Sequence, residues 1–89
     1  MRNPILGSKF RRDVKRMEKR GKEMGKLREC IRLLIEGHSL PAQYKDYPLA
    51  GDWKHLRDCH VEPDWVLIYK VDGNELHLVR TGTHADLFG

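Results

Sequence analysis

Two apolar segments separated by a tight turn constrain the fold of this chain more than any other feature. Residues 65–71 (WVLIYKV) are rich in β-branched and aromatic side chains, and residues 75–81 (ELHLVRT) can return beside them. The Asp72-Gly73-Asn74 segment between them is a strong β-hairpin signal. Pairing of the two strands would bring Asp64 and Thr81 to the same end of a sheet, so the side chains around both residues become neighbours.

The first part of the chain predicts two amphipathic helices joined by a short connection. Ser8 is a suitable N-cap for the first helix, and Gly21 is placed to end it. Gly37 is placed to end the second helix. Apolar residues recur at helical spacing in both segments: Phe10, Val14 and Met17, then Met24, Leu27, Ile31 and Leu34. The short connection predicts an antiparallel helical hairpin whose apolar stripes must cover another element.

These elements predict an α+β fold in which an N-terminal helical hairpin packs on one face of a twisted antiparallel sheet of three or four strands. Residues 53–61 would supply a third strand. If residues 1–6 form a strand, it lies at an edge or begins at a bulge, because Pro4 lacks a backbone N–H. Residues 38–52 carry turn signals and are interpreted as a loop. We expect the second face of the sheet to be open.

The alternation of side chains along the last strand conflicts with a purely polar open face. Arg80 falls on the same side of its strand as Leu76 and Leu78. Either a bulge intervenes before Arg80, or the face that carries it is mixed in character. Both alternatives are compatible with the sequence.

The length and the uneven charge of the chain bound its function. Eighty-nine residues predict a single domain, residues 1–89, with a thin core and a shallow surface site. Residues 1–36 carry twelve Lys or Arg and five Asp or Glu, a net charge of +7, whereas residues 37–89 carry five and eight, a net charge of −3. All five histidines lie in the second part. Most basic faces are only solvated, but the charge and the histidines together favour a polyanionic substrate.

The sequence also predicts where the protein works. Residues 1–10 have no apolar run long enough for a signal peptide, and no segment approaches the roughly 20 apolar residues that span a membrane. Cys30 and Cys59 are too few for a disulfide scaffold of the secreted type. We therefore expect no membrane partner and a location in the reducing cytoplasm.

Side chains suited to acid/base chemistry on a phosphodiester gather at the predicted end of the hairpin. Metal-independent cleavage of RNA needs a base for the 2′-OH, an acid for the departing 5′ oxygen and a cation for the phosphorane. Histidine suits both proton roles, and arginine suits the third. His60, Asp64, Arg80 and His84 can share one patch. A zinc site of Cys59, His60 and His84 is a weaker alternative, because adjacent Cys-His lies outside the usual ligand spacings. We expect no metal and no cofactor.

Each of these residues taken singly also has a structural explanation. Asp64 can be a turn residue, and Arg80 can be the strand-end partner of a carboxylate. Trp65 and Phe88 can be packing residues. For any one of these residues the structural explanation is favoured over the catalytic one. Four residues of types suited to catalysis at one end of the sheet make a purely structural explanation less favoured. The histidines that we assign to the surface without a catalytic role are His38, His55 and His77.

Short motifs in the second half make a family resemblance specific. The chain carries the motifs H-x-x-x-D-W, L-I-Y and R-T-G-T-H in this order, followed by L-F-G at the end. On these motifs the chain resembles the YafQ family of bacterial type II toxins, in the RelE/ParE superfamily. Residues 10–34 resemble the helical hairpin of that family, so the likeness covers nearly the whole chain from Phe10. It implies the RelE-like fold of two helices on a twisted antiparallel sheet.

The resemblance also implies an activity and partners. Such toxins are ribosome-dependent mRNA endoribonucleases that enter the A site, cut the message and arrest translation. A cognate antitoxin protein neutralises the toxin. Operator DNA is a partner only indirectly, through the toxin–antitoxin complex.

Carried over position by position, the resemblance makes His60, Asp64, Arg80 and His84 the catalytic residues. His84 is the expected general acid, and Asp64 is the expected base. His60 either shares the role of base or donates a hydrogen bond to the phosphate. Arg80 would stabilise the phosphorane.

We assign four further residues to substrate binding: Tyr47, Lys54, Trp65 and Phe88. Trp65 and Phe88 would shape the site or stack on a base, a contact worth roughly 1–3 kcal/mol. Tyr47 departs from the family, which usually has histidine at that place in the motif YKDYPL. A phenol, with a pKa near 10, is a poor base at neutral pH but a good hydrogen-bond donor. We therefore predict a weaker or differently tuned nuclease.

Two other hypotheses stay open. A toxin of the same superfold can act by binding alone, as gyrase-inhibiting toxins do. A weakened relic would only bind its antitoxin, and Tyr47 makes that hypothesis worth testing. The His60, Asp64 and His84 set distinguishes the nuclease from both, because neither needs an acid/base pair.

Overall fold

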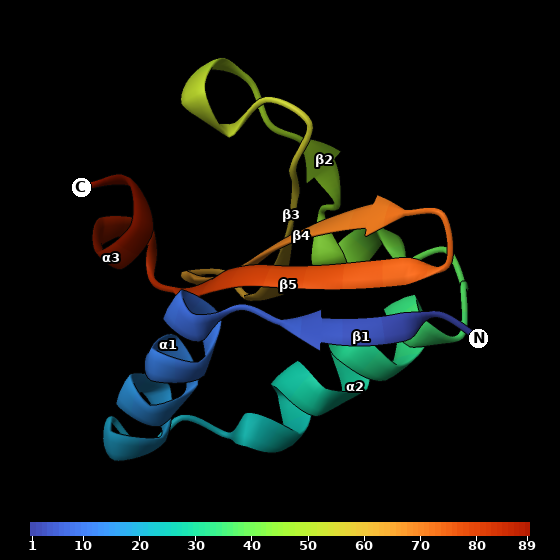
Figure 1. Cartoon of the computed structure of the whole chain (residues 1–89). Helices are drawn as coiled ribbons and strands as arrows, with labels where there is room; N and C mark the ends of the chain where they lie inside the picture. The colour runs from blue at the N-terminus through green and yellow to red at the C-terminus, as the bar shows by residue number, and fades with distance from the viewer.

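The computed structural model describes residues 1–89, which form a five-stranded sheet and three α-helices (Figure 1). The strands are β1 (Asn3–Leu6), β2 (Tyr47–Pro48), β3 (Arg57–Glu62), β4 (Trp65–Asp72) and β5 (Glu75–Gly82), and the α-helices are α1 (Ser8–Lys19), α2 (Met24–Ile35) and α3 (His84–Phe88). Two one-turn 3-10 helices, η1 (Ala42–Tyr44) and η2 (Gly51–Trp53), lie between α2 and β3. None of the helices combines the length and the apolar character that a membrane-spanning helix requires.

The sheet is mixed, with strand order β1-β5-β4-β3-β2. The expectation of a purely antiparallel sheet of three or four strands is therefore wrong. β1 lies parallel to β5, with Asn3 beside Glu75 and Leu6 beside Leu78, because the chain crosses over through α1 and α2 before it returns to the sheet. β1 is an edge strand, as Pro4 requires.

The central hairpin of β4 and β5 is confirmed, and it contains a bulge. Asp72 pairs with Glu75 around a turn in which Gly73 takes a positive φ of 59°. Farther from the turn, Tyr69 pairs with Leu78, whereas Ile68 pairs with Arg80. One extra residue of β5 is therefore inserted just before Arg80, and the bulge is the correct one of the two alternatives.

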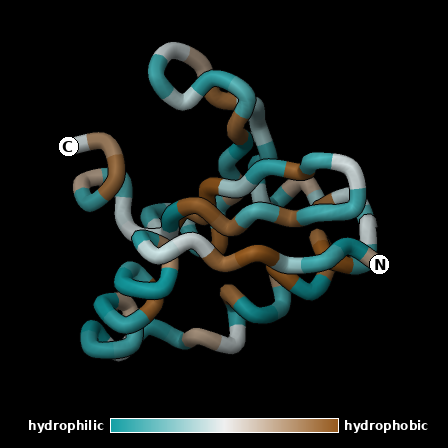
Figure 2. The backbone as a smooth tube through the Cα atoms, viewed as in Figure 1, coloured by the Kyte–Doolittle hydropathy of each residue, from teal (hydrophilic) through white to brown (hydrophobic).

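The main core lies between the sheet and the pair α1 and α2, as the helical periodicity predicts. The buried side chains of this core are Phe10, Met17, Leu27, Cys30, Leu34, Cys59, Trp65, Leu67, Tyr69, Leu76 and Leu78. Figure 2 shows hydrophobic segments concentrated along the strands, while the outer turns of α1 are hydrophilic. The thiols of Cys30 and Cys59 meet in this core with their Sγ atoms 3.2 Å apart. That hydrogen bond and burial both raise the pKa of Cys59, so the pair packs as apolar groups.

The second face of the sheet is not open, which corrects the expectation. Val66, Ile68 and Leu87 form a smaller buried cluster there, and Trp53 and Val79 pack against it. The predicted strand over residues 53–61 begins only at Arg57. Residues 38–52, expected to be a loop, contain η1, β2 and η2. Trp53 ends the 3-10 helix η2 and packs against this second cluster.

α1 and α2 end next to the predicted glycines, but the N-cap of α1 lies one residue before the predicted one. Gly7 is the N-cap of α1, and Ser8 is its first helical residue, without a side-chain cap. α1 and α2 are followed by Gly21 and Gly37, whose φ angles of 79° and 80° lie in the left-handed region that favours glycine.

Candidate active site

The most direct contact among the predicted site residues joins His84 to Asp64. Oδ1 of Asp64 lies 2.7 Å from Nδ1 of His84 and also accepts the backbone N–H of His84 at 3.0 Å. His84 is the first residue of α3, which follows β5 directly. The two hydrogen bonds from His84 lower the pKa of Asp64 below its ordinary value, so the carboxylate stays charged at neutral pH.

α3 holds His84 through a complete capping box. The Thr83 hydroxyl accepts the N–H of Asp86, and the Asp86 carboxylate accepts the N–H of Thr83. Arg20 at the end of α1 donates two hydrogen bonds to Asp86, at 2.6 and 3.0 Å. The hydrogen bond from Arg20 is the largest cause that holds the pKa of Asp86 far below its ordinary value. These contacts anchor the N-terminus of α3 to the rest of the fold, and the imidazole of His84 lies at that end of the helix.

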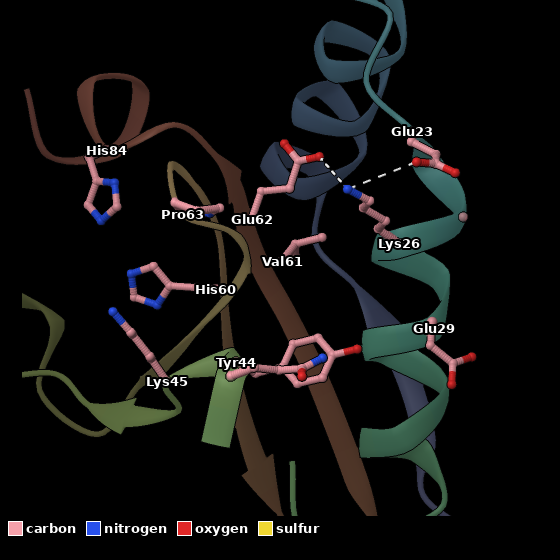
Figure 3. Close-up of a pocket in the computed structure, with 12 residues that line it drawn as sticks. Glu23, Lys26, Glu29, Tyr44, Lys45, His60, Val61, Glu62, Pro63 and His84 are labelled. Carbon is pink, nitrogen blue, oxygen red and sulfur yellow. Dashed lines mark hydrogen bonds and ion pairs between the residues drawn. The ribbon is translucent and has the colours of Figure 1, made fainter. Parts of the chain in front are cut away.

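His60 on β3 faces His84 across the end of β4, which lies between β3 and β5 in the sheet. The ring centroids are 5.4 Å apart, and Figure 3 shows the two rings opposite one another. The regular pairing of β3 with β4 shifts just after His60, where the chain turns through Glu62 toward Asp64. Nδ1 of His60 is buried and has no hydrogen-bond partner. Buried polar atoms without a partner are uncommon, and a catalytic role is one of the recognised reasons for them.

A polar groove of about 730 Å³ contains both imidazoles. It lies between the N-terminal half of α2, the turn after β3, and the segment around η1 (Figure 3). Tyr44 and Lys45 line it on the η1 side, and Lys26 and Glu62 lie on the α2 side. An open groove lined mainly by polar and charged residues suits part of an extended chain better than an enclosed small molecule.

Asp58 belongs to the same face of the sheet, although the sequence analysis did not select it. Asp58 and His60 are two residues apart on β3 and therefore point the same way. Burial raises the pKa of Asp58, while the charges of His60 and His84 act in the opposite direction. The alternation of side chains along the predicted strand would have indicated that Asp58 shares the face of His60.

Arg80 makes its hydrogen bonds away from the histidines. Its Nε and one terminal nitrogen donate to the two carboxylate oxygens of Asp13 on α1, at 2.7 and 3.2 Å. Asp13 is buried, and it also accepts the N–H of Thr81 at 3.1 Å and a hydrogen bond from Arg16. Burial alone would raise the pKa of Asp13, but the hydrogen bonds from Arg80 and Thr81 outweigh it and lower the pKa. The structure thus brings together His60, Asp64 and His84, whereas Arg80 is bound to α1.

The aromatic residues assigned to substrate binding differ in exposure. Trp65 is fully buried, and its Nε1 donates to the Thr81 hydroxyl at 2.9 Å, so it cannot stack on a base in this structure. Phe88 is 41% exposed and lies edge-on to Trp53 at 5.5 Å, with the His84 ring 6.1 Å away. Only Phe88 of this pair therefore offers a ring to a ligand.

The two polar residues assigned to substrate binding lie on the second face or beside it. Tyr47 is 60% exposed and pairs with Asp58 across β2 and β3, which places it on the face that carries His60. Lys54 follows η2 and is exposed.

Potential metal ligands are arranged differently from the zinc alternative. Cys59 is buried in the main core, and its neighbour His60 points to the other face, so the two cannot share an ion. Asp72, Glu75 and His77 lie close enough to one another to hold a cation at the hairpin turn. That cluster is at the opposite end of β5 from His84.

Several known proteins resemble this chain over most of its length. The family described as bacterial toxin of type II toxin-antitoxin system, YafQ, matches residues 3–89. The mRNA interferase toxin YafQ of Escherichia coli strain K12 is 56% identical over 81 residues, which cover 90% of this chain and 88% of that protein. The putative toxin YafQ of Haemophilus influenzae is 35% identical over 83 residues, covering 85% of this chain and 81% of that protein.

A solved structure extends the comparison to the fold. The toxin in the crystal structure of the E. coli DinJ-YafQ complex superposes with a TM-score of 0.93 and 51% identity, over 100% of both chains. The sequence match and the fold match both span nearly the whole chain. The chain therefore belongs to the YafQ family of bacterial type II toxin–antitoxin toxins.

Proposed function

We propose that this protein is an mRNA endoribonuclease toxin that cuts messages at the His60–His84 pair. The observation that carries the proposal is the 5.4 Å separation of the two imidazole rings, with His84 held by Asp64 at 2.7 Å. Two imidazoles on opposite sides of a small gap can act as base and acid on one phosphodiester. The E. coli relative, 56% identical, is an mRNA interferase toxin.

The contacts favour an assignment of the proton roles. Asp64 already accepts two hydrogen bonds at Oδ1, so it serves best to hold His84 with Nδ1 as donor. The other ring nitrogen of His84, in the protonated imidazole, can give its proton to the departing 5′ oxygen. His60 then takes the proton of the ribose 2′-OH, whose oxygen attacks phosphorus. The P–O5′ bond breaks, and a 2′,3′-cyclic phosphate and a 5′-hydroxyl end result. In this assignment His60 is the base. The family resemblance gave that role to Asp64, with His60 as a possible partner.

We infer that the protein acts on ribosome-bound message and that a cognate antitoxin controls it. The net charge of +7 over residues 1–36 supports attraction to ribosomal RNA near the A site. The toxin of the E. coli DinJ-YafQ complex has the same fold, which supports an antitoxin of that kind for this chain. Contact with operator DNA would be indirect, through the antitoxin.

Mapping of transcript ends after induced expression tests the proposal. The wild type and the His38→Ala control should produce new in-frame 5′ ends within translated messages and arrest growth. His38 lies outside the groove, bonded to Glu36, so its removal deletes a histidine without touching the site. His84→Ala should abolish both effects while it still folds. The same messages incubated without ribosomes should stay intact if cleavage needs the ribosome.

The outcome separates the proposal from its rivals. Intact messages together with a DNA-damage response to the wild type would point to a gyrase-inhibiting toxin and overturn the nuclease proposal. Intact messages with normal growth and tight antitoxin binding would indicate a relic.

A further inference from the structure

The proposed reaction needs a cation beside the scissile phosphate, because negative charge accumulates on the phosphoryl oxygens in the transition state. The sequence assigned this role to Arg80, whose guanidinium is bound to the buried carboxylate of Asp13. Two lysines line the groove that contains the imidazoles, Lys26 and Lys45. The amine of Lys26 lies 3.0 Å from Oε2 of Glu62, so its charge is already matched.

Lys45 is the groove cation whose charge is free. Its side chain is exposed, and its amine makes no hydrogen bond or ion pair within the protein. Figure 3 shows the amine directed toward His60, from the side of that ring opposite His84. A phosphate in contact with the His60 ring would therefore lie close to a primary ammonium that has no competing partner.

The backbone at Lys45 is held in an unusual conformation. Lys45 has φ 46° and ψ 62°, in the left-handed region that residues other than glycine rarely adopt. Both neighbours are anchored to the fold. Tyr44 packs against the main core, and Oδ1 of Asp46 accepts hydrogen bonds from Nε of Arg57 at 3.1 Å and from the Tyr69 hydroxyl at 2.6 Å.

This anchoring explains why the strained conformation persists. With Tyr44 and Asp46 both fixed, Lys45 must take up the change of direction between them and turn its side chain toward the groove. Strain at a residue other than glycine is maintained only where the surrounding structure imposes it, and it occurs often at functional sites.

We propose that Lys45 is a further catalytic residue, whose ammonium contacts the scissile phosphate and stabilises the charge that develops as the 2′ oxygen attacks. This inference rests on the proposed nuclease function and adds to it the cation that Arg80 does not supply. Lys45 donates to the phosphoryl oxygens and exchanges no proton. Arg80 instead fixes the end of β5 to α1 and so positions the strand that carries α3.

Single-turnover cleavage of a message on programmed ribosomes tests the inference, with rate and ribosome affinity measured separately. Lys45→Asn removes the charge and keeps a residue that tolerates the left-handed conformation. It should lower the rate at saturating toxin by roughly 10²-fold with little change in affinity. Lys45→Arg, which keeps the charge, should restore most of the rate. Circular dichroism and antitoxin binding of each variant should match the wild type.

Lys15→Gln is the matched control, because it removes one charge from an exposed residue of α1 that does not line the groove. Wild-type rates for Lys45→Asn, alongside full loss in His84→Ala, would refute the role of Lys45 and leave the nuclease function standing. The same would follow if Lys45→Asn and Lys15→Gln lowered affinity equally and left the rate unchanged. Uncut messages with the wild type would overturn the function itself and, with it, this inference.

Discussion

Nδ1 of His84 lies 2.7 Å from Oδ1 of Asp64, and the same oxygen accepts the backbone N–H of His84. One carboxylate oxygen therefore fixes both the start of α3 and the orientation of its imidazole. The hydrogen bond also selects the tautomer, because Nδ1 must carry the proton. The remaining ring nitrogen is then available to a substrate in the gap toward His60.

Asp64→Asn should lower the cleavage rate by roughly 10²–10⁴-fold while the fold survives, because an amide neither fixes the same tautomer nor stabilises an imidazolium. Single-turnover cleavage on ribosomes measures the effect. Asp52→Asn, which changes an exposed carboxylate of η2, is the control and should cut at the wild-type rate. A wild-type rate for Asp64→Asn would show that Asp64 does not orient the acid.

Tyr47→His should raise the cleavage rate, by roughly tenfold, because it adds an imidazole beside Asp58 on the face of His60. Tyr47→Phe separates the two properties of the side chain, since it keeps the ring and loses the hydroxyl. If the hydroxyl donates to the phosphate, Tyr47→Phe should lower the rate. A fall in rate for Tyr47→His would count against the predicted role of this position.

Gly82→Ala should displace α3 and lower both stability and cleavage. A Cβ at Gly82 would lie 2.9 Å from Oδ2 of Asp86, closer than real Cβ contacts, and 3.0 Å from Cβ of Asp86, which is tighter than most. We expect a loss of about 1–3 kcal/mol in the free energy of unfolding. Gly25→Ala is the control, because a Cβ there meets nothing nearer than 3.8 Å and the substitution should stabilise α2. Urea unfolding measures both, and equal stability for the two variants would contradict the prediction.

Asp13→Asn should weaken the fold at neutral pH by about 2 kcal/mol, because the buried acceptor for Arg80 loses its charge. The folded pKa of Asp13 lies below its ordinary value of 3.8. Its stabilising contribution is therefore fully present above about pH 4 and is lost as the pH falls through the lower folded value. Unfolding free energies between pH 7 and pH 2 should fall less steeply for Asp13→Asn than for the wild type. Parallel curves for the two proteins would exclude this linkage.

Part of the fold and of the site could be predicted because local signals determine it. Gly73 accepts the positive φ that the hairpin turn needs, and that turn alone sets the ends of β4 and β5 side by side. Asp64 and His84 flank those ends, so their contact needs no long-range information. The apolar stripes of α1 and α2 likewise show which faces are buried.

Other features depended on contacts between distant segments. Strand alternation alone places Asp58 on the face of His60, but its burial depends on the packing of other elements around it. The left-handed backbone of Lys45 follows from the anchoring of Asp46 to Arg57 and Tyr69, which no local motif encodes. The parallel pairing of β1 with β5 requires the whole helical crossover to be in place.

The sequence by itself determined the hairpin, the two amphipathic helices and the pairing of Asp64 with His84, since each depends on residues that a short turn brings together. Only the tertiary structure decided the partner of Arg80. Asp13 lies 67 positions away in the chain, and its carboxylate became the acceptor because packing of α1 on β5 buried it there. A buried carboxylate requires a partner, and burial is a property of the assembled fold that neighbouring residues do not specify.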